Sequence, residues 1–571
     1  MSSNMATLTP SLSSSATDLS KSHIPITDND EKRQDVELGS AVDSSVHDKE
    51  AEENGEPLGQ QLSQVDTSDY PTKIPLVMIV VALCLAVFMM ALDMTIVATA
   101  IPKITDEFHS LDQVGWYGSA FFLTVAAFQS TWGKAFKYFP LKTSFLLSMF
   151  IFELGSLICA VANGSTMLII GRAIAGAGGA GLSSGAYTII AFSAPPRQRP
   201  AFTGVLGAVF GVASVIGPLL GGVFTDDLSW RWCFYINLPV GGLAAAMVFF
   251  FFTPPKASKP VQATLKEKLL QMDLPGTFTI MAATVCYLLA MQWGGSTKPW
   301  SDGSVIGTLV AFGVLVIVFV AIEWYSGNRA LLQFRLLKDR TIAASVGYIF
   351  IISGSFFILL YYLPIYFQAT KHVSASRSGI DNLPLVFGAS IFSVVSGVLI
   401  TITGHYVPLM VFGSVVSSVG CGLVYTLDIT SGSGKWIGYQ ALCGIGLGLV
   451  FQIPVIVNQS VVKVSDLATI SAMTLFFQTI GGAFMISAAQ AGFTNKLIER
   501  LPFTAPGADK TLVLMTGASE LRNTFHGEQL AGVLAAYMDG LKVPFALAIA
   551  CAATSTLVAF GPKWQTIKVR M

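Results

Sequence analysis

Apolar stretches of about 20 residues recur along this chain, and they restrict its fold more than any other feature. An α-helix of about that length crosses the hydrocarbon core of a bilayer while satisfying its backbone hydrogen bonds within itself. The composition agrees, with 53% hydrophobic and 12% charged residues and a mean hydropathy of +0.63. Soluble domains carry about twice that share of charge. The sequence therefore predicts an all-α polytopic membrane protein embedded in a lipid bilayer.

The apolar stretches predict fourteen transmembrane helices. One long loop, residues 491–539, separates the last two, and its alternating apolar and charged pieces (512–515 and 530–537) predict short interfacial helices. The predicted spans cover about 74–101, 115–136, 142–162, 166–193, 201–224, 232–252, 273–293, 304–324, 341–368, 379–402, 406–427, 434–461, 466–490 and 540–560.

The charges are unevenly distributed along the chain. Residues 1–72 hold 14 acidic and 4 basic residues, whereas the remainder holds 20 acidic and 30 basic residues. A polar, acidic segment with few aromatics cannot bury enough apolar area to offset the entropy of ordering, so we predict a disordered acidic tail. The tail is either a passive solvated segment or a site of phosphorylation or turnover control. No basic arm or basic-aromatic patch indicates a nucleic-acid partner.

The basic residues of the short loops predict the orientation in the membrane. With the amino terminus inside, inner loops hold fourteen Lys and Arg residues and outer short loops hold six, which agrees with the positive-inside rule. Both termini are then cytoplasmic, and the segment 491–539 is extracellular. A multi-pass protein of the plasma membrane is expected, with the vacuolar membrane as the alternative because no address signal is evident. We expect a monomer.

Motifs of soluble enzymes do not account for this chain. It has no phosphate-binding G-x-x-x-x-G-K-[ST] and no H-E-x-x-H. The string from Gly181 to Gly185 matches G-x-S-x-G, but it lies in a membrane span rather than in a strand-turn-helix setting. The seven cysteines lie in or beside apolar spans without metal-ligand spacing. We therefore expect no enzyme activity, no catalytic residues, no cofactor and no metal site.

Charged residues inside the spans are the first candidates for function. A charge in a helix centre costs about 2.5–3.5 kcal/mol on insertion scales, so such residues are retained for a reason. Asp93 in span 1 can bind and release a proton as its access to solvent alternates. Arg172 in span 4 shares a helix face with Gly176, Gly179 and Ser183, which give its guanidinium room near a neighbouring helix. Glu153 in span 3 is a third candidate, for function or for helix packing.

Polar and aromatic residues in other spans are candidates for a substrate pocket. Each of them could instead form a hydrogen bond between helices. A glycosylation sequon begins at Asn163, in a turn too tight to favour modification. The proposed pocket residues are Gln129, Tyr361, Tyr362, Gln452, Asn458 and Gln478, with Gln459, Tyr366, Phe476 and Phe477 as further candidates.

Span 5 carries a stripe of small residues at helical spacing. Small residues let membrane helices approach closely, and proline is tolerated in such bundles. Alone, the stripe is consistent either with a generic packing face or with a functional helix contact. Its members are Gly204, Gly207, Gly211, Ser214, Pro218 and Gly221.

Spans 1, 4 and 5 each contain a sequence motif that one protein family has in the same spans and in the same order. The chain resembles the major facilitator superfamily, and within it the fourteen-span drug:proton antiporters. The strings GKAFKYFPLK, IFELGSLICA and YYLPIYFQA resemble fungal toxin and multidrug efflux pumps. The motifs are Leu92-Asp93-Met94-Thr95-Ile96-Val97 with Ile101-Pro102, Gly171-Arg172 with Gly176 and Gly179, and Gly207, Gly211, Gly217-Pro218 and Gly221-Gly222.

The resemblance implies a fold and a function. Two six-helix bundles are expected, with a cytoplasmic linker and two inserted spans between them and a substrate pocket near the midplane. It implies proton coupling at Asp93 and Arg172, an antiporter motif in span 5, and export of small amphipathic organic compounds. The implied parts are 73–252 (first bundle), 253–272 (linker), 273–324 (inserted spans), 325–560 (second bundle) and 561–571 (cytoplasmic tail).

The resemblance fails at one loop, and two other functions stay open. The family pattern G-x-L-x-D-R-x-G-R-R aligns with residues 133–142, where Lys137 occupies the usual aspartate position. The salt bridges of the family's inner gate are therefore not expected in their usual form. The alternatives are uptake of siderophore–iron, which also uses fourteen-span facilitators, and a non-transporting membrane sensor or receptor.

Overall fold

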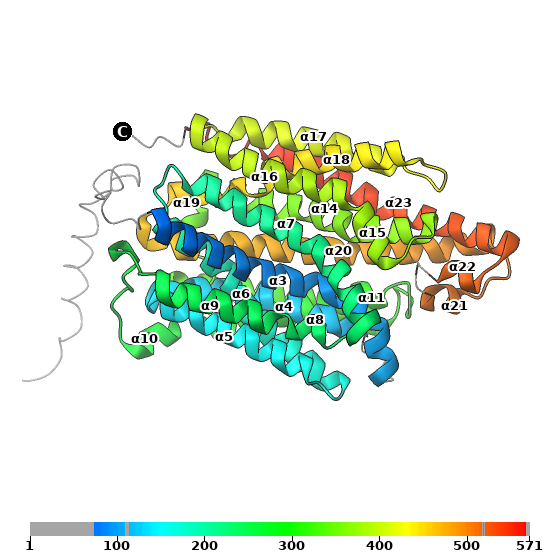
Figure 1. The fold of residues 1–571 in the computed structure, drawn as a ribbon, viewed down its shortest axis with the longest axis horizontal. Coiled ribbons are helices and arrows are strands. Elements are labelled where there is room, and N and C mark those ends of the chain that lie inside the picture. Colours follow the sequence, from blue (N-terminus) through cyan, green and yellow to red (C-terminus); the bar gives the residue numbers. More distant parts are fainter. Residues whose placement is uncertain (1–72, 109–113, 517, 519, 567–571) are drawn as a thin grey trace, which may run out of the picture. The chain divides into compact units, whose positions relative to one another are not determined.

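The computed structural model describes residues 73–108, 114–516, 518 and 520–566, and these residues form a helical protein (Figure 1). The predicted acidic tail, residues 1–72, lies outside the described residues. Within the described part, the long helices pack in two groups, with a separate pair of helices along one side.

The first group follows the amino-terminal third of the chain. α6 lies at its centre and contacts α4, α5, α3 and α7, while α9 packs on α3 and α5. A short π-helix, Phe224–Leu228, links α7 to α8. The helices are α3 (Lys73–Phe108), α4 (Val114–Tyr138), α5 (Leu141–Ala160), α6 (Ser165–Ser193), α7 (Arg199–Val223), α8 (Trp232–Tyr235) and α9 (Asn237–Phe251).

The second group follows the carboxyl-terminal part of the chain. α14 packs on α20 and α23, and α18 packs between α16 and α17. Its helices are α14 (Arg340–Lys371), α15 (Ala375–Asp381), α16 (Leu383–Thr403), α17 (Val407–Tyr425), α18 (Ser433–Phe451), α19 (Ile453–Val461), α20 (Leu467–Thr504), α21 (Lys510–Met515), α22 (Leu521–Thr524) and α23 (Gly527–Val558).

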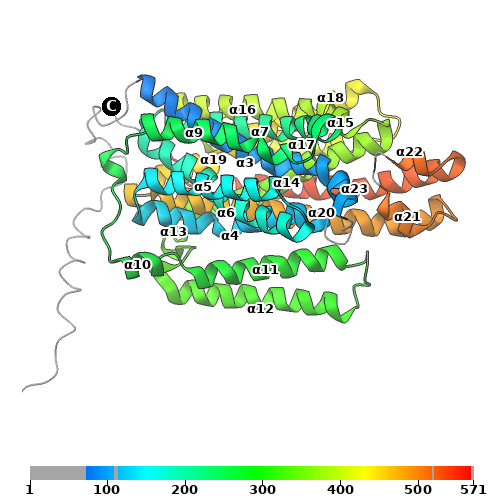
Figure 2. The same cartoon turned by 60° about the horizontal axis from the view of Figure 1, so that its bottom comes forward.

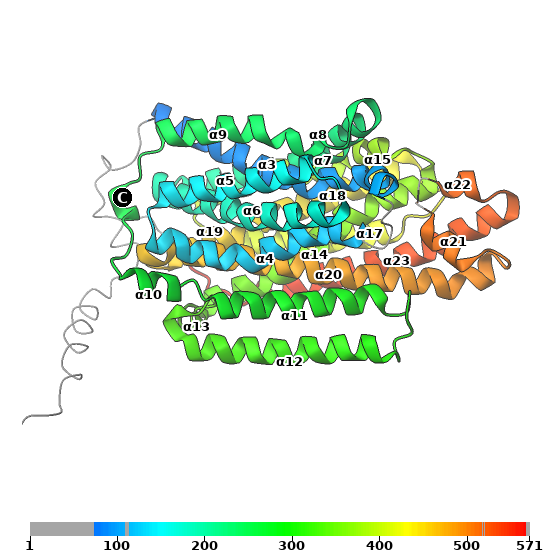
Figure 3. The same ribbon diagram turned by 90° about the horizontal axis from the view of Figure 1, so that it is seen from below.

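The separate pair consists of α11 (Leu274–Trp293) and α12 (Gly303–Ser326), which lie along one side of both groups (Figures 2 and 3). α10 (Leu265–Leu270) precedes the pair and α13 (Phe334–Leu337) follows it. α11 contacts both α4 and α20, through Thr131–Thr277 at 2.9 Å and through the Tyr287 hydroxyl, which donates to the Phe484 carbonyl at 3.1 Å. The pair therefore touches both groups at once.

The ends of the long helices define two ends of the molecule. α10 lies at one of them, and α21 and α22 lie at the other, in all three views (Figures 1 to 3). α13 lies near α10 in Figures 2 and 3. We call them the α10 end and the α21 end. The short-loop charges predict that the α10 end is cytoplasmic.

Several helices begin where an aspartate can cap the first turn. Asp273, Asp302 and Asp339 accept hydrogen bonds from backbone N–H groups of Gly276 (3.1 Å), Ser304 (2.8 Å) and Thr341 (2.7 Å). These aspartates precede α11, α12 and α14 and satisfy donors that the helix itself leaves free. Local sequence thus sets where these three membrane helices start.

The all-α multi-pass fold agrees with the sequence prediction. Thirteen helical stretches in the described ranges are long and apolar enough to cross a membrane. The span predicted at 115–136 forms α4, which has 25 residues but is not among those thirteen. Polar residues such as Gln129 and Lys134 reduce its hydropathy. The count of fourteen spans therefore stays a prediction.

The segment 491–539 differs from the long loop that we predict. α20 runs on to Thr504 and α23 already begins at Gly527, so both helices extend into it. α21 accounts for the predicted short helix at 512–515, but residues 530–537 belong to α23. The reason is an apolar stripe that continues along α20 at helical spacing and packs on α23, with the Phe493 and Tyr537 ring centroids 5.5 Å apart.

Small residues set the distance between α5 and α6. A Cβ atom built on Gly155 would lie 2.6 Å from the Cα atom of Ala175, and one built on Gly178 would lie 2.7 Å from the Phe152 Cα atom. Real side chains do not approach that closely, so both glycines are required for this contact. The packing shows how membrane helices associate without a hydrophobic driving force between them.

We expect Gly155→Leu to destabilise the protein strongly, because the added side chain must push α6 away. Overpacking of this kind costs about 1–3 kcal/mol or more. The matched control is Gly242→Leu on α9, where a Cβ atom meets nothing within 4 Å. Thermal unfolding of the purified proteins in detergent checks this, and equal midpoints for the two variants would contradict it.

Candidate functional site

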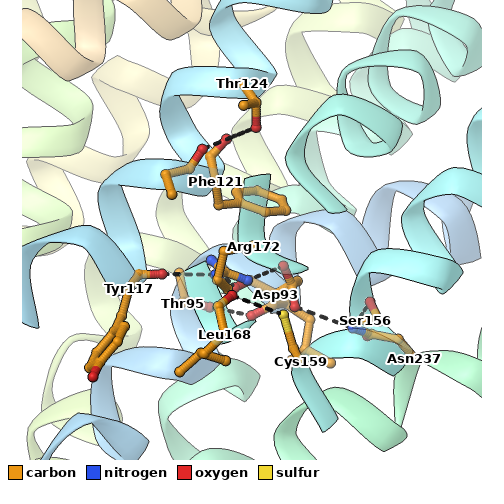
Figure 4. A network of polar contacts seen from close by, with 12 residues as sticks. Asp93, Thr95, Tyr117, Phe121, Thr124, Ser156, Cys159, Leu168, Arg172 and Asn237 are labelled. Atoms are coloured by element: carbon orange, nitrogen blue, oxygen red, sulfur yellow. Dashed lines mark hydrogen bonds and ion pairs between the residues drawn. The ribbon is translucent and has the colours of Figure 1, made fainter. Parts of the chain in front are cut away.

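A buried ion pair joins α3 to α6 inside the first group (Figure 4). The Arg172 Nη1 atom donates to the Asp93 Oδ2 atom, and both side chains are 0% exposed. The Arg172 Nη2 atom also donates to the Asp93 carbonyl at 3.3 Å. The two charged residues that we selected from spans 1 and 4 are therefore direct partners.

Neighbouring helices complete the surroundings of the pair. The Arg172 Nε atom donates to the Tyr117 carbonyl at 2.8 Å, and its guanidinium lies 4.4 Å from the centroid of the Phe121 ring. The Asn237 amide donates to the Asp93 Oδ1 atom at 3.3 Å and to the Ser156 hydroxyl at 3.2 Å. We did not select these partners from the sequence, because they are uncharged or contribute only backbone atoms.

This arrangement makes the charge state of Asp93 structurally important. Separating two buried charges is costly, because whichever partner loses the contact stays desolvated without compensation. A proton on Asp93 removes one of the two charges and thereby weakens the attraction to Arg172. Binding of a proton can therefore change how α3, α6 and α9 are held together.

The glycines of α7 face two different helices. In its first half, a Cβ atom on Gly204 would lie 2.6 Å from the Ser393 carbonyl of α16, and one on Gly207 would lie 2.5 Å from the Gln452 Nε2 atom. The stripe thus packs on the second group in this half. Gly211 continues the contact, against Ser390.

In the second half of α7, the same stripe turns to α3. The added Cβ atoms of Gly217 and Gly221 would meet the hydroxyl groups of Thr95 and Thr99. Gly222 is buried, and the helix continues through Pro218. Thr95 follows Asp93 by two residues, so one glycine motif touches both the opposite group and the helix that carries the buried acid.

Two of the predicted pocket residues, Gln129 and Gln452, form hydrogen bonds with polar side chains of α6. The Gln129 amide of α4 donates to the Ser183 hydroxyl at 2.8 Å. One turn further along α6, the Tyr187 hydroxyl donates to the Gln452 Oε1 atom at 3.1 Å. Ser183 and Tyr187 thus place Gln129 and Gln452 along the same face of α6. Tyr187 was not among the residues selected from the sequence.

The other predicted pocket residues lie elsewhere. The Asn458 amide donates to the Thr474 hydroxyl at 2.9 Å, within the second group. The Tyr362 hydroxyl donates to the Gln490 Oε1 atom at 3.0 Å, and its neighbour Tyr361 is half exposed. The Gln478 Oε1 atom is buried without a hydrogen-bond partner among the described residues. Asn163, in the α5–α6 turn, is exposed.

At the α10 end, an ion pair connects the two groups where the family motif departs. The Lys137 Nζ atom lies 2.9 Å from the Asp466 Oδ1 atom, and Arg335 lies 2.9 Å from the other carboxylate oxygen. The Asp466 side chain is 4% exposed. Lys137 occupies the usual aspartate position, so a base stands here in place of the family's acid and pairs with an acid of the second group. Sequence reasoning missed Asp466 because it is the first residue of the predicted span 466–490, where an acid at a helix start needs no special explanation.

A second cluster at the α10 end ties the inserted pair to α4. The buried Lys134 Nζ atom donates to the Asn328 carbonyl at 2.8 Å. Glu323, at the end of α12, is buried and accepts from the Leu332 N–H at 2.7 Å, while Asp273 accepts from the Leu331 N–H at 3.2 Å. The buried charges of this cluster come from the inserted helices as well as from α4.

The arrangement of helices is that of known transporters. A family model described as the Major Facilitator Superfamily matches residues 83–486. The chain belongs to the Major Facilitator Superfamily. It is therefore a multi-pass membrane transporter, as the sequence motifs predict. The solved structure of the proton:xylose symporter XylE covers 86% of this chain and 98% of its own, with a TM-score of 0.55 at 12% identity, which shows the shared fold.

Several fungal proteins are similar over most of their length. The MFS-type transporter grgE of Penicillium sp is 46% identical, covering 94% of this chain and 97% of grgE. The MFS-type efflux pump MFS1 of Arthroderma benhamiae is 45% identical, covering 88% and 94%. The efflux pump aunC of Aspergillus niger is 44% identical, covering 93% and 95%.

We expect Lys137 and Asp466 to be energetically coupled. In a double-mutant cycle with Lys137→Ala and Asp466→Ala, the second substitution should cost less once the first is present, with a coupling energy of about 0.5–3 kcal/mol. The exposed pair Lys496–Glu499, at 2.9 Å on one helix, is the control and should give about 0.5 kcal/mol or less. Unfolding in mixed detergent and denaturant measures both. Equal coupling at the two pairs would refute this assignment.

Proposed function

We propose that this protein is a proton-coupled antiporter that exports small amphipathic organic compounds, such as a fungal toxin, a secondary metabolite or a drug. The observation that carries the proposal is the buried Asp93–Arg172 pair, which joins two helices through a group that a proton neutralises. Relatives named as efflux pumps support the direction of transport.

The coupling follows from the surroundings of Asp93. In the conformation described here, Asp93 is paired with Arg172 and neither side chain is accessible. We propose that Asp93 is ionised in this state. Protonation of Asp93 weakens that contact and frees α3 to move against α6. α7 transmits the movement, because its glycines pack on α3 in one half and on α16 of the second group in the other.

The α10 end is closed in this conformation. Lys137–Asp466 bridges the groups there, and a Cβ atom on Gly133 of α4 would lie 3.1 Å from the Ala468 carbonyl of α20. With that end on the cytoplasmic side, the transporter must break the bridge to admit a compound from the cell. The Lys137–Asp466 bridge is thus proposed to serve as the inner gate.

A proton gradient supplies enough free energy for such a pump. One charge moving through 100 mV contributes about 2.3 kcal/mol, and one pH unit adds about 1.4 kcal/mol. Together these support roughly a 500-fold gradient of a neutral compound at 1.4 kcal/mol per tenfold. We propose that the protein acts in the plasma membrane, with both termini in the cytoplasm.

We expect Asp93→Asn to abolish proton-driven transport while the protein stays folded, because the amide cannot exchange a proton. Arg172→Ala should also impair transport strongly. The measurement is ethidium movement by purified protein in liposomes, with and without an imposed pH gradient. Size-exclusion profiles of the variants confirm folding. Gradient-driven transport by Asp93→Asn at the wild-type rate would overturn the proposed coupling, and wild-type protein that moves no ethidium under the gradient would count against the proposed export itself.

We expect Gly217→Leu to slow ethidium transport about tenfold or more, because the side chain must displace Thr95 and with it the segment that carries Asp93. Gly211→Leu should act similarly by separating α7 from α16. The matched control is Val212→Leu on the more exposed face of α7. Transport by the glycine variants at the control rate would return the stripe to a simple packing role.

A further inference from the structure

Glu153 on α5 has a half-buried side chain that ends in an enclosed carboxyl group. Both of its carboxyl oxygens are inaccessible and have no hydrogen-bond partner among the residues that the structure describes. An ionised carboxylate in such a place would lose its hydration without any donor to replace it, which costs several kcal/mol or more. An environment of this kind favours the neutral, protonated form of the carboxyl group.

The position of that acid is specific. A Cβ atom built on Gly241 of α9 would lie 2.6 Å from the Glu153 Cδ atom and 3.2 Å from the Met89 Sδ atom of α3. The carboxyl group thus fills a space that exists because residue 241 lacks a side chain. It points between α3 and α9.

The helix register places Glu153 next to the Asp93 site. The Asn237 amide of α9 donates hydrogen bonds to Asp93 of α3 and to Ser156 of α5, so these three residues lie at one height along the helices. We call this height the Asp93 level. Met89 precedes Asp93 by four residues, Glu153 precedes Ser156 by three, and Gly241 follows Asn237 by four. Because α9 runs opposite to α3 and α5, all three steps lead toward the α10 end. Glu153 therefore lies about one helical turn, roughly 5.4 Å, below the Asp93 level.

The charged groups around Glu153 are few. α3 brings Asp93, whose charge acts on Glu153, and α6 brings Arg172, which is already bonded to Asp93. The sequence of α9 contains no titratable residue. Two carboxyl groups and one guanidinium group thus lie in this region between the helices. With one proton between the two acids, the three groups have no net charge.

We propose that Glu153 is a second proton-binding residue, which exchanges its proton with Asp93 during transport. This inference rests on the proposed antiport function. In the step, the O–H bond of Glu153 breaks and an O–H bond forms on Asp93. Glu153 becomes the carboxylate, Asp93 becomes neutral, and Arg172 is released from Asp93. Ser156, at the level of Asp93 and one turn from Glu153 on the same helix, carries a hydroxyl that can accept and donate in turn.

The reverse of this step, in which Asp93 returns the proton to Glu153 and pairs again with Arg172, accounts for how a proton leaves Asp93 toward the α10 end. Asp93 and Arg172 are sealed from solvent, so a proton cannot reach that end from Asp93 directly. The Glu153 carboxyl group lies one turn closer to the α10 end and shortens the path of the proton. Because the two acids share one proton, two negative charges are not placed together between these helices. The burial of a protonated acid beside the pair thus has a role beyond packing.

The bound proton is tested by infrared spectroscopy of the full-length protein in lipid nanodiscs at neutral pH. We expect wild-type protein to show a carbonyl band of a protonated carboxyl group that is missing in Glu153→Gln and retained in Asp93→Asn. Glutamine has nearly the shape of the protonated acid, so the fold is preserved. A spectrum of Glu153→Gln that keeps the band would overturn the assignment of the proton.

The exchange is tested by ethidium transport in liposomes. We expect Glu153→Gln to lower gradient-driven transport about tenfold or more, because the amide cannot take up or release a proton, and Glu153→Asp to restore part of it. Exchange of ethidium without a pH gradient should persist in Glu153→Gln, which a purely structural defect would not spare.

The outcomes separate this inference from the proposed function. Wild-type transport that Glu153→Gln leaves unchanged would reduce Glu153 to a packing acid while the antiport mechanism stands. Wild-type protein that moves no ethidium under a pH gradient would overturn the antiport mechanism and the exchange step together. The infrared spectra still decide whether Glu153 holds the proton.

Discussion

The burial of one ion pair constrains the whole first group of helices. Asp93 and Arg172 are sealed between α3 and α6, where neither charge can be hydrated if the other withdraws. The remaining lone pairs and donors are met by the Asn237 amide and the Tyr117 carbonyl. Each of these groups comes from a different helix. The helices must therefore keep their relative positions as long as Asp93 is ionised, and a proton is the smallest ligand that can release them.

The glycine stripe of α7 connects this constraint to the second group. Its glycines let α7 approach α16 in one half and α3 in the other, so the helix cannot follow one neighbour without moving against the second. At the α10 end, Lys137, at the usual aspartate position of the family pattern, forms an ion pair with Asp466 that holds the groups together. The departure from the family pattern therefore still leaves an ion pair between the two groups at this end.

The inserted helices make direct contacts with both groups of helices. α11 touches α4 and α20 directly, and Lys134 of α4 reaches the turn after α12. Movement of the two groups at the α10 end must therefore shift or strain these contacts. Buried acidic residues recur at this end, in Glu323 and Asp273, whereas the outer face of α12 is apolar and exposed, as expected for a surface that meets lipid.

The sequence alone determined the fold class, the order of the helices and the two charged residues of the buried pair. Apolar length and the cost of charge in lipid act on each span separately, so they can be read without knowing the neighbours. The tertiary structure decided which side chains meet. Asn237 at Asp93, Tyr187 at Gln452 and Asp466 at Lys137 are contacts between distant segments, and no local pattern encodes them. Of the six pocket candidates, only Gln129 and Gln452 bond to the same face of α6. Much of the segment 491–539 is helical, because packing between α20 and α23 outweighs the polar composition of that segment.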